Sequence, residues 1–118
     1  MLPYPPTTQP RRPRLTIIDQ TVELQTGREW DFPPRWLAMG QTYEIAWVGT
    51  VRAYVGLFPQ ASYQAMRQRG GPAPFAFGSD RLSSARQVAL PANGWYHLVA
   101  RVGVFTPPGR IRIGLYQV

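Results

Sequence analysis

Residues 43–58 read YEIAWVGTVRAYVGLF, and apolar side chains recur there at every second position. A period of two is typical of a β-strand that buries one face and exposes the other. Gly49 and Thr50 interrupt the pattern, and such small turn-forming residues between two alternating runs favour a hairpin. We therefore expect Tyr43–Val48 and Val51–Phe58 to be neighbouring antiparallel strands joined by a tight turn.

The same period continues on both sides of this stretch, separated by turn signals such as Thr26-Gly27 and Asn93-Gly94. Outside the first pair, the expected strands are Leu15–Leu24, a short one around Phe75 and Phe77, Arg86–Leu90, Trp95–Phe105 and Arg110–Val118. About seven to eight short antiparallel strands predict an all-β fold, either a β-sandwich or a jelly roll. We expect residues 16–118 to form this single domain, because the segment is long enough to bury one core.

Two segments depart from the strand pattern. Ser62–Arg69 can form one or two helical turns inside a long connection, residues 59–84, which suits a crossover between sheets or a functional loop. Trp30, Phe32 and Trp36 surround Pro33-Pro34. We expect these bulky side chains to close one end of the core as a hydrophobic lid, and the alternative is an exposed tryptophan pair that stacks on sugars.

The N-terminal residues 1–15 read MLPYPPTTQPRRPRL, with five prolines, three arginines and no acid. Proline lacks an amide donor, so this segment is expected to be an extended Pro/Arg-rich arm rather than a helix or a central strand. A stiff arm loses little entropy on docking. We therefore expect Arg11, Arg12 and Arg14 to contact a partner, while the arm itself adds almost nothing to domain stability; a solvated tail is the alternative.

The amino-acid composition indicates which kinds of partner the protein suits and which kinds of metal site it excludes. Thirteen arginines, no lysine and six acids give a net charge of +7, which suits an acidic protein surface or nucleic acid. The lack of cysteine excludes disulfides and thiolate metal sites. The sequence contains no apolar run long enough to span a membrane, and its start does not resemble a signal peptide. We therefore expect a virion or cytoplasmic location and no membrane partner.

The last two predicted strands flank the loop Thr106-Pro107-Pro108-Gly109 and are expected to form a hairpin. If Phe105 and Arg110 flank the loop, the residues that face each other across the two strands are apolar pairs. These pairs are Val104 with Ile111, Val102 with Ile113 and Ala100 with Leu115. The opposite side would gather a basic-aromatic face, which we define as Arg101, Phe105, Arg110, Arg112 and Tyr116. Contact with a protein is the favoured interpretation. A stacking surface for single-stranded nucleic acid and a plain structural face are the alternatives.

Few side chains suggest catalysis. His97 is the single histidine, and with no cysteine and scattered carboxylates it does not predict a zinc site. Glu29 and Asp31 flank Trp30 and could serve a glycosidase or bind calcium, but pairing with arginines is the favoured interpretation. We therefore expect a non-enzymatic protein without catalytic residues, metal or cofactor.

Residues 40–118 resemble a small bacterial β-sandwich family of unknown function, some members of which are joined to TIR domains. The residues that carry the resemblance are Gly40, Val51–Leu57, Tyr63, Arg69-Gly70 and the run Leu90–Val99 before a final strand. Leu90–Tyr96 also resembles the strand entry of prepeptidase C-terminal domains. The resemblance implies a β-sandwich and, since the family has no assigned activity, implies no reaction.

Together these features favour a non-enzymatic assembly subunit that docks on a larger particle through its arm and its basic-aromatic face. A phage virion component, such as a capsid decoration or connector protein, is the most concrete form, with a homo-oligomer expected. The alternative is a single-stranded nucleic-acid binding module that uses the same face.

Overall fold

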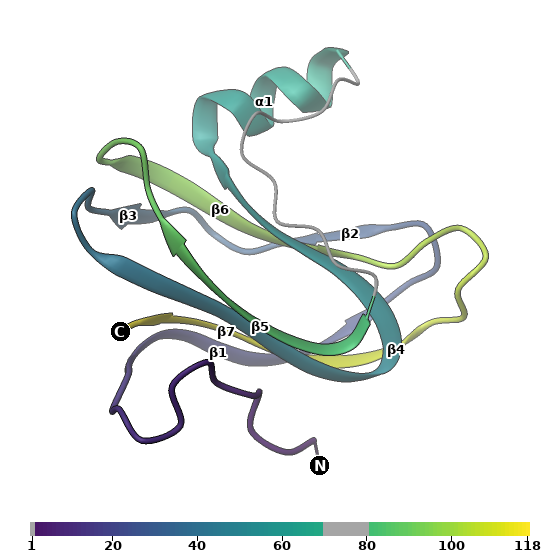
Figure 1. The fold of residues 1–118 in the computed structure, drawn as a ribbon. Helices are drawn as coiled ribbons and strands as arrows, with labels where there is room; N and C mark the ends of the chain where they lie inside the picture. Colours follow the sequence, from purple (N-terminus) through teal and green to yellow (C-terminus); the bar gives the residue numbers. More distant parts are fainter. Residues whose placement is uncertain (1, 70–80) are drawn as a thin grey trace.

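A computed structural model describes residues 2–69 and 81–118 (Figure 1). The elements in this part of the chain are β1 (Leu15–Leu24), β2 (Glu29–Asp31), β3 (Arg35–Leu37), β4 (Thr42–Pro59), α1 (Gln60–Arg69), β5 (Arg81–Ala89), β6 (Gly94–Arg101) and β7 (Gly109–Gln117). All strand pairs between these elements are antiparallel. The predicted all-β fold is therefore confirmed.

Strand β4 belongs to two layers of one continuous, nearly barrel-shaped sheet. Its first half pairs with β7 and with β5, and its second half pairs with β6. We call β1, β7, β5 and the first half of β4 the β1 layer; the β6 layer contains β6, β2, β3 and the second half of β4. The two layers lie one above the other in Figure 1, and the chain passes between them along β4.

The hairpin expected in residues 43–58 is wrong, because the segment is one long bent strand. In the described residues a positive φ occurs at Gly27 and Gly40 and not at Gly49, so the tight hairpin turn that needs this geometry is absent there. A Cβ at position 49 would lie 2.6 Å from Ile111 Cγ2 and 2.8 Å from the Arg110 carbonyl oxygen. Gly49 therefore permits close approach of β7 and does not mark a reversal of the chain.

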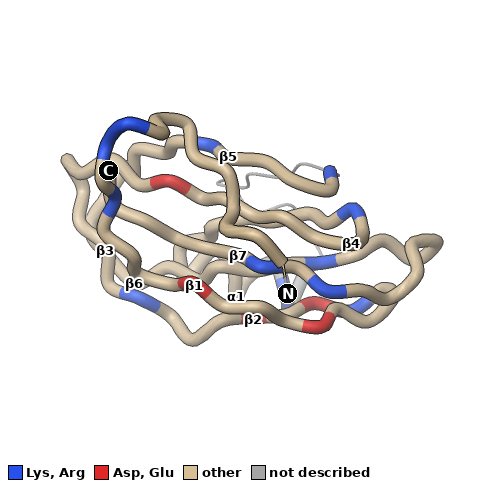
Figure 2. Tube along the Cα trace, turned by 90° about the horizontal axis from the view of Figure 1, so that it is seen from below, with Lys and Arg blue, Asp and Glu red and all other residues tan. Residues whose placement is uncertain are grey.

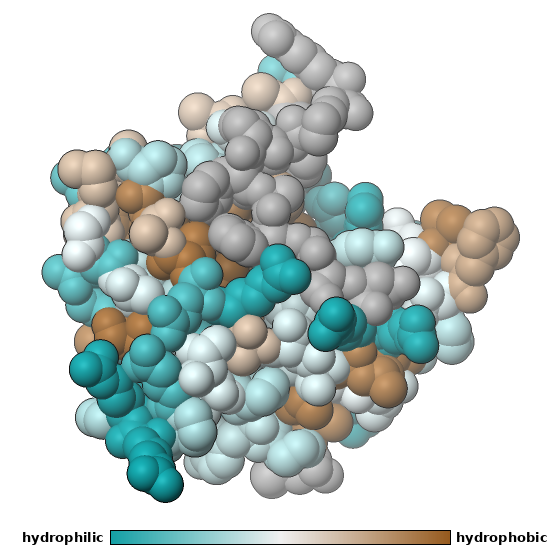
Figure 3. Space-filling model, in the orientation of Figure 1, coloured by the Kyte–Doolittle hydropathy of each residue, from teal (hydrophilic) through white to brown (hydrophobic). Residues whose placement is uncertain are grey.

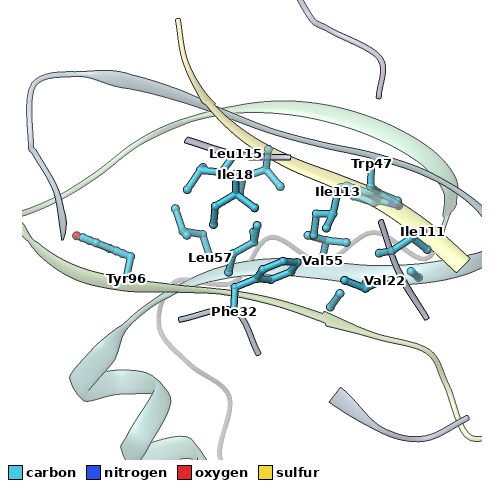
Figure 4. Close-up of a cluster of buried hydrophobic side chains, with 14 of the residues drawn as sticks. Ile18, Val22, Phe32, Trp47, Val55, Leu57, Tyr96, Ile111, Ile113 and Leu115 are labelled. Carbon is cyan, nitrogen blue, oxygen red and sulfur yellow. The ribbon is translucent and has the colours of Figure 1, made fainter. Parts of the chain in front are cut away.

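The core lies between the layers, where their apolar faces meet (Figure 4). Its central members include Ile18, Val22, Phe32, Trp47, Val55, Leu57, Tyr96, Ile111, Ile113 and Leu115. The five side chains predicted to be buried by the final strands, Ala100, Val102, Ile111, Ile113 and Leu115, are all buried. The alternation was wrong for Val104, which was placed on the same face and is 70% exposed, and for Tyr116, which was placed on the opposite face and is buried.

The pairing of those final strands was predicted incorrectly. β6 pairs with β4, β2 and β3, whereas β7 pairs with β1 and β4, so the two strands lie in different layers. Residues 102–108 cross from one layer to the other (Figure 1). β6 and β7 do not pair with each other because each of them pairs with β4 instead. A short connection can join strands in two packed layers as well as the two strands of a hairpin.

Other elements agree in part with the sequence pattern. The expected helical turns lie within α1, which packs against β6 and β4. The strands β2 and β3 were expected as an apolar loop, and the strand expected around Phe75 and Phe77 lies outside the described residues. Within residues 2–69 and 81–118, no helix is long and apolar enough to cross a membrane.

Candidate docking site

The N-terminal arm lies against the outer surface of the β1 layer. Pro5 is buried, and the Arg14 guanidinium donates hydrogen bonds of 3.1 Å to the carbonyl oxygens of Pro5 and Pro6. A turn closed by the Arg12 amide and the Gln9 carbonyl, 3.0 Å apart, leaves Arg11 and Arg12 exposed. The arm is therefore part of the folded domain, whereas the sequence favoured an arm that is independent of it.

A fully buried carboxylate, Glu44 of β4, holds the arm in place. It accepts hydrogen bonds from the Thr7 hydroxyl (3.0 Å), from the Thr8 amide (2.6 Å) and hydroxyl, and from Arg14 Nη1 (2.7 Å). Gln87 of β5 donates in turn to the Thr8 hydroxyl. Burial alone raises the pKa of Glu44, but the hydrogen bonds from Thr8, Arg14 and Thr7 outweigh this effect and hold the pKa below its ordinary value.

Tyr116 and Arg112, both predicted to contact a partner, are instead occupied by the arm and by β1. The Arg14 guanidinium carbon lies 3.6 Å from the centroid of the Tyr116 ring, and Tyr116 is buried. Arg112 donates two hydrogen bonds, of 2.8 and 2.7 Å, to Asp19, and its guanidinium stacks 4.0 Å from the Tyr4 ring centroid. The hydrogen bond from Arg112 lowers the pKa of Asp19. Tyr116 and Arg112 therefore hold the arm in place and are not part of a surface that is free to bind a partner.

The remaining two arginines of the basic-aromatic face lie on opposite layers. Arg110 of β7 pairs with Glu23 at 3.0 Å, and both side chains are largely exposed, so this ion pair contributes little to stability. Arg101 ends β6, with its guanidinium 5.7 Å from the Tyr54 ring centroid. Figure 2 shows basic segments spread over several strands and the arm. The prediction of one basic-aromatic face is therefore wrong, because it depended on the incorrect β6–β7 pairing.

Phe105 is the apolar member of the predicted site residues that the described structure leaves fully exposed; Arg11, Arg12 and Arg101 are exposed as well. Its side chain is 99% exposed, and the neighbouring Val104 is 70% exposed. The loop that carries them is fixed at its base: the Thr106 amide donates to the Gly103 carbonyl (3.1 Å), and the Thr26 hydroxyl donates to the Thr106 carbonyl (2.7 Å). We call residues 104–108 the tip. In Figure 3 a hydrophobic projection lies on the same side as the β6–β7 connection of Figure 1.

A second exposed apolar feature, which we call the tryptophan groove, lies where β3 pairs with β6. Trp36 and Trp95 are directly opposite across these strands, with ring centroids 5.6 Å apart in an edge-to-face arrangement. They are 58% and 49% exposed, and Trp30 is exposed too, so the predicted lid is wrong for Trp30 and Trp36, although Phe32 is buried. The groove has a volume of about 510 Å³ and is lined by Ile17, Pro34, Arg35, Trp36, Leu37, Tyr43, Trp95 and Gln117.

Hydrogen bonds fix the wall of this groove. The Ala38 amide donates to the Tyr43 hydroxyl at 2.9 Å, and the Met39 amide donates to Asn93 Oδ1 at 2.6 Å. The connection from β3 to β4 is therefore tied both to β4 and to the turn before β6. A groove held in this way needs little rearrangement when it binds a ligand.

A polar cluster lies between α1 and the β6 layer, with His97 and Tyr63 buried and the carboxylates Glu29 and Asp31 exposed. His97 Nδ1 lies 2.8 Å from Asp31 Oδ1, and the His97 ring lies 4.9 Å from the Tyr63 ring centroid. The Tyr63 hydroxyl donates to Glu29 Oε2 at 3.1 Å. Glu29 and Asp31 thus pair with a tyrosine and the histidine, not with arginines as predicted. Burial, with Asp31 and Glu29, raises the pKa of Tyr63 to about 12.

This cluster has the geometry of an oriented histidine–carboxylate pair, which can move a proton in principle. However, His97 and Tyr63 are both buried and stacked on each other. We interpret the cluster as the polar anchor of α1 on the β6 layer. Among residues 2–69 and 81–118, no group of three or more histidine, cysteine or acidic side chains could hold a metal ion.

Comparison with known proteins gives no assignment for this arrangement. The sequence matches no protein-family model, and no curated protein matches it. The resemblance to the β-sandwich family of unknown function therefore stays a prediction.

The lowered pKa of Glu44 predicts that acid loosens the arm. Folding lowers the pKa of Glu44 from 4.5, so its ionised carboxylate stabilises the folded state at any pH above 4.5. This contribution is lost as the pH falls through the lower pKa of the folded state. We expect the thermal midpoint to fall steeply below that pH. The Glu44→Gln variant should be less stable at neutral pH and show a weaker acid dependence. An equal acid dependence in both proteins would show that Glu44 does not couple the arm to pH.

Proposed function

We propose that the protein is a non-enzymatic assembly subunit that docks on a larger particle through the tip. The observation that carries this proposal is the exposure of Phe105 and Val104 on a loop whose base is fixed by hydrogen bonds. An aromatic side chain that is fully exposed and held in a rigid loop is suited to fill a pocket on a partner, because its burial supplies apolar area at a small cost in entropy. A virion component remains the concrete form of this proposal.

The arm has a different role in this proposal from the one expected from the sequence. Arg14, Thr7 and Thr8 are occupied by Glu44, so the arm braces the β1 layer. The exposed Arg11 and Arg12 are the arm residues that remain available to a partner. We assign the main contact to the tip, because apolar burial contributes more to affinity than exposed charges do.

A photo-crosslinking residue tests the proposal directly. We expect benzoylphenylalanine in place of Phe105 to form adducts of defined mass with a protein, both in the purified sample and in the cells that make the protein. The same residue at Leu82, a 51% exposed side chain on β5, is the matched control and should give no such adduct. If position 105 gives no adduct in either sample, or gives the same pattern as position 82, the tip is not a docking site.

For the alternative function, binding of single-stranded nucleic acid, the described residues offer the exposed Arg101 beside the Tyr54 ring. A titration with a labelled oligonucleotide at low and moderate salt separates the two functions, because binding to phosphates weakens steeply with salt. We expect no binding that depends on these two residues. Salt-sensitive binding that is lost when both are replaced with alanine would favour the nucleic-acid module.

A further inference from the structure

We infer that the partner of the tip is a second copy of this chain, whose tryptophan groove receives Phe105 and the prolines that follow it. This inference rests on the proposed function and names its partner. The structure presents two apolar features that are exposed and different from each other, the tip and the tryptophan groove. A contact between unlike patches on identical subunits is heterologous, so each copy would use its tip on one neighbour and its groove on another.

The chemistry of the groove matches that of the tip. Trp36 and Trp95 are largely exposed and meet edge to face, and proline-containing segments dock in aromatic-lined grooves because they are already extended and stiff. The tip supplies Phe105 followed by Thr106-Pro107-Pro108. Arg35 in the groove lining carries guanidinium donors that can bond the carbonyl oxygens of such a segment.

Charge also favours the tip as the part of a second copy that enters the groove. Each chain carries a net charge of +7, so two copies repel each other on the whole. Residues 102–109 contain no charged side chain, and the groove lining contains one, Arg35. Docking the tip in the groove therefore brings no two like charges together at the contact.

The two features lie at opposite ends of β6, which prevents a chain from filling its own groove. Trp95 follows the first residue of β6, whereas Val104 and Phe105 lie just beyond its last residue, Arg101. Eight residues of strand span roughly 25 Å. In Figure 1, β3 and the β6–β7 connection accordingly lie on opposite sides of the molecule. The contact must therefore form between molecules, and its repetition gives a chain or a closed ring.

The area of this contact predicts weak association. A tip of a few residues in one groove covers much less than the roughly 1,200–2,000 Å² that a stable pairwise interface buries. We therefore expect reversible, concentration-dependent assembly rather than a permanent dimer. Because the copies repel each other, the association should strengthen as salt screens their charges, which is the opposite of assembly through nucleic acid.

Two variants, each lacking one half of the contact, test the inference by sedimentation velocity. Phe105→Ala removes the tip side chain, and Trp36→Ala removes one wall of the groove; both side chains are mostly exposed, so both variants should fold. We expect the mean mass of the native protein to rise with concentration, and each variant alone to remain a monomer. An equal mixture should form a dimer and nothing larger, because one intact tip meets one intact groove. Trp95→Ala is a second groove variant.

Two control variants are measured by sedimentation velocity, and contrary results come from sedimentation and from crosslinking at position 105. Trp30→Ala and Leu82→Ala remove exposed apolar side chains elsewhere and should associate as the native protein does. A native protein that stays monomeric at every concentration and salt overturns the inference, as does a mixture that stays monomeric while the native protein associates. Adducts of position 105 with a different protein alone would keep the proposed function and reject self-assembly. No adduct at all would reject both.

Discussion

Replacing Ile113 with alanine is expected to lower the free energy of unfolding by about 2–5 kcal/mol. Ile113 lies in the middle of β7, is fully buried, and belongs to the cluster between the two layers (Figure 4). Its neighbours come from strands that are hydrogen-bonded on both sides of β7, so they cannot close over the space that the side chain leaves. A cavity therefore adds to the lost transfer free energy. Urea unfolding followed by far-ultraviolet circular dichroism measures the change.

Two comparison variants test whether the loss of stability in Ile113→Ala comes from a cavity in the core. Ile113→Val should cost about 0.5–1.5 kcal/mol, since it removes one methylene group. Arg112 lies one position along the strand, on its outer face. Any destabilisation by Arg112→Ala should come from the lost ion pair with Asp19, because this substitution creates no internal cavity. If Ile113→Ala cost no more than Ile113→Val, the side chain would not lie between packed layers as described.

Part of the fold was predictable because period-two alternation reports which side chains are buried. Ile113, Val102 and Ala100 were assigned to the core correctly, although their strands were paired wrongly. Alternation carries no information about which strand lies next to which, since every buried face in the molecule has the same pattern. The bend of β4 was missed for a related reason: a glycine needed for close approach and a glycine in a turn look alike in a sequence.

The candidate docking site was predictable in one respect only. Phe105 was identified as a site residue, but it was placed on one face with Arg101 and Tyr116, whereas β6 and β7 lie in different layers and Tyr116 is buried under the arm. The tryptophan groove was not predicted: the alternative considered was an exposed pair of Trp30 and Trp36, whereas the short pairing of β3 with β6 brings Trp36 opposite Trp95. That pairing lies in a segment too short and too rich in proline to show any period.

The contact between the arm and Glu44 joins residues that are 30 or more positions apart, so no local pattern reveals it. One signal was present: Glu44 is an acid inside an apolar strand, and a carboxylate that is buried there requires donors from elsewhere. An arm that contains Thr7, Thr8 and Arg14 and no acid can supply them. The role of the arm in stability therefore follows from the chemistry of a strand residue rather than from the arm itself.

Arg14→Ala is accordingly expected to lower the free energy of unfolding by about 3 kcal/mol, because it leaves a buried carboxylate without its cation. Arg14 Nη1 lies 2.7 Å from Glu44 Oε2, and the Glu44 side chain has no exposed surface. The same substitution removes the guanidinium that stacks on Tyr116 and bonds the carbonyl oxygens of Pro5 and Pro6. The expected cost is at the low end for such a change, since the arm can lift and admit water to the carboxylate.

Urea unfolding, which does not screen ion pairs, measures this cost against two controls. Arg12→Ala removes an exposed arginine of the same arm and should change the free energy of unfolding by less than about 0.5 kcal/mol. Adding Glu44→Gln to Arg14→Ala should recover part of the loss, because a neutral amide is cheaper to bury than an unpaired charge. If Arg14→Ala and Arg12→Ala unfold at the same urea concentration, the arm is independent of the domain, as the sequence suggested. A loss confined to Arg14→Ala and partly reversed by Glu44→Gln would show that the arm is held by one buried ion pair.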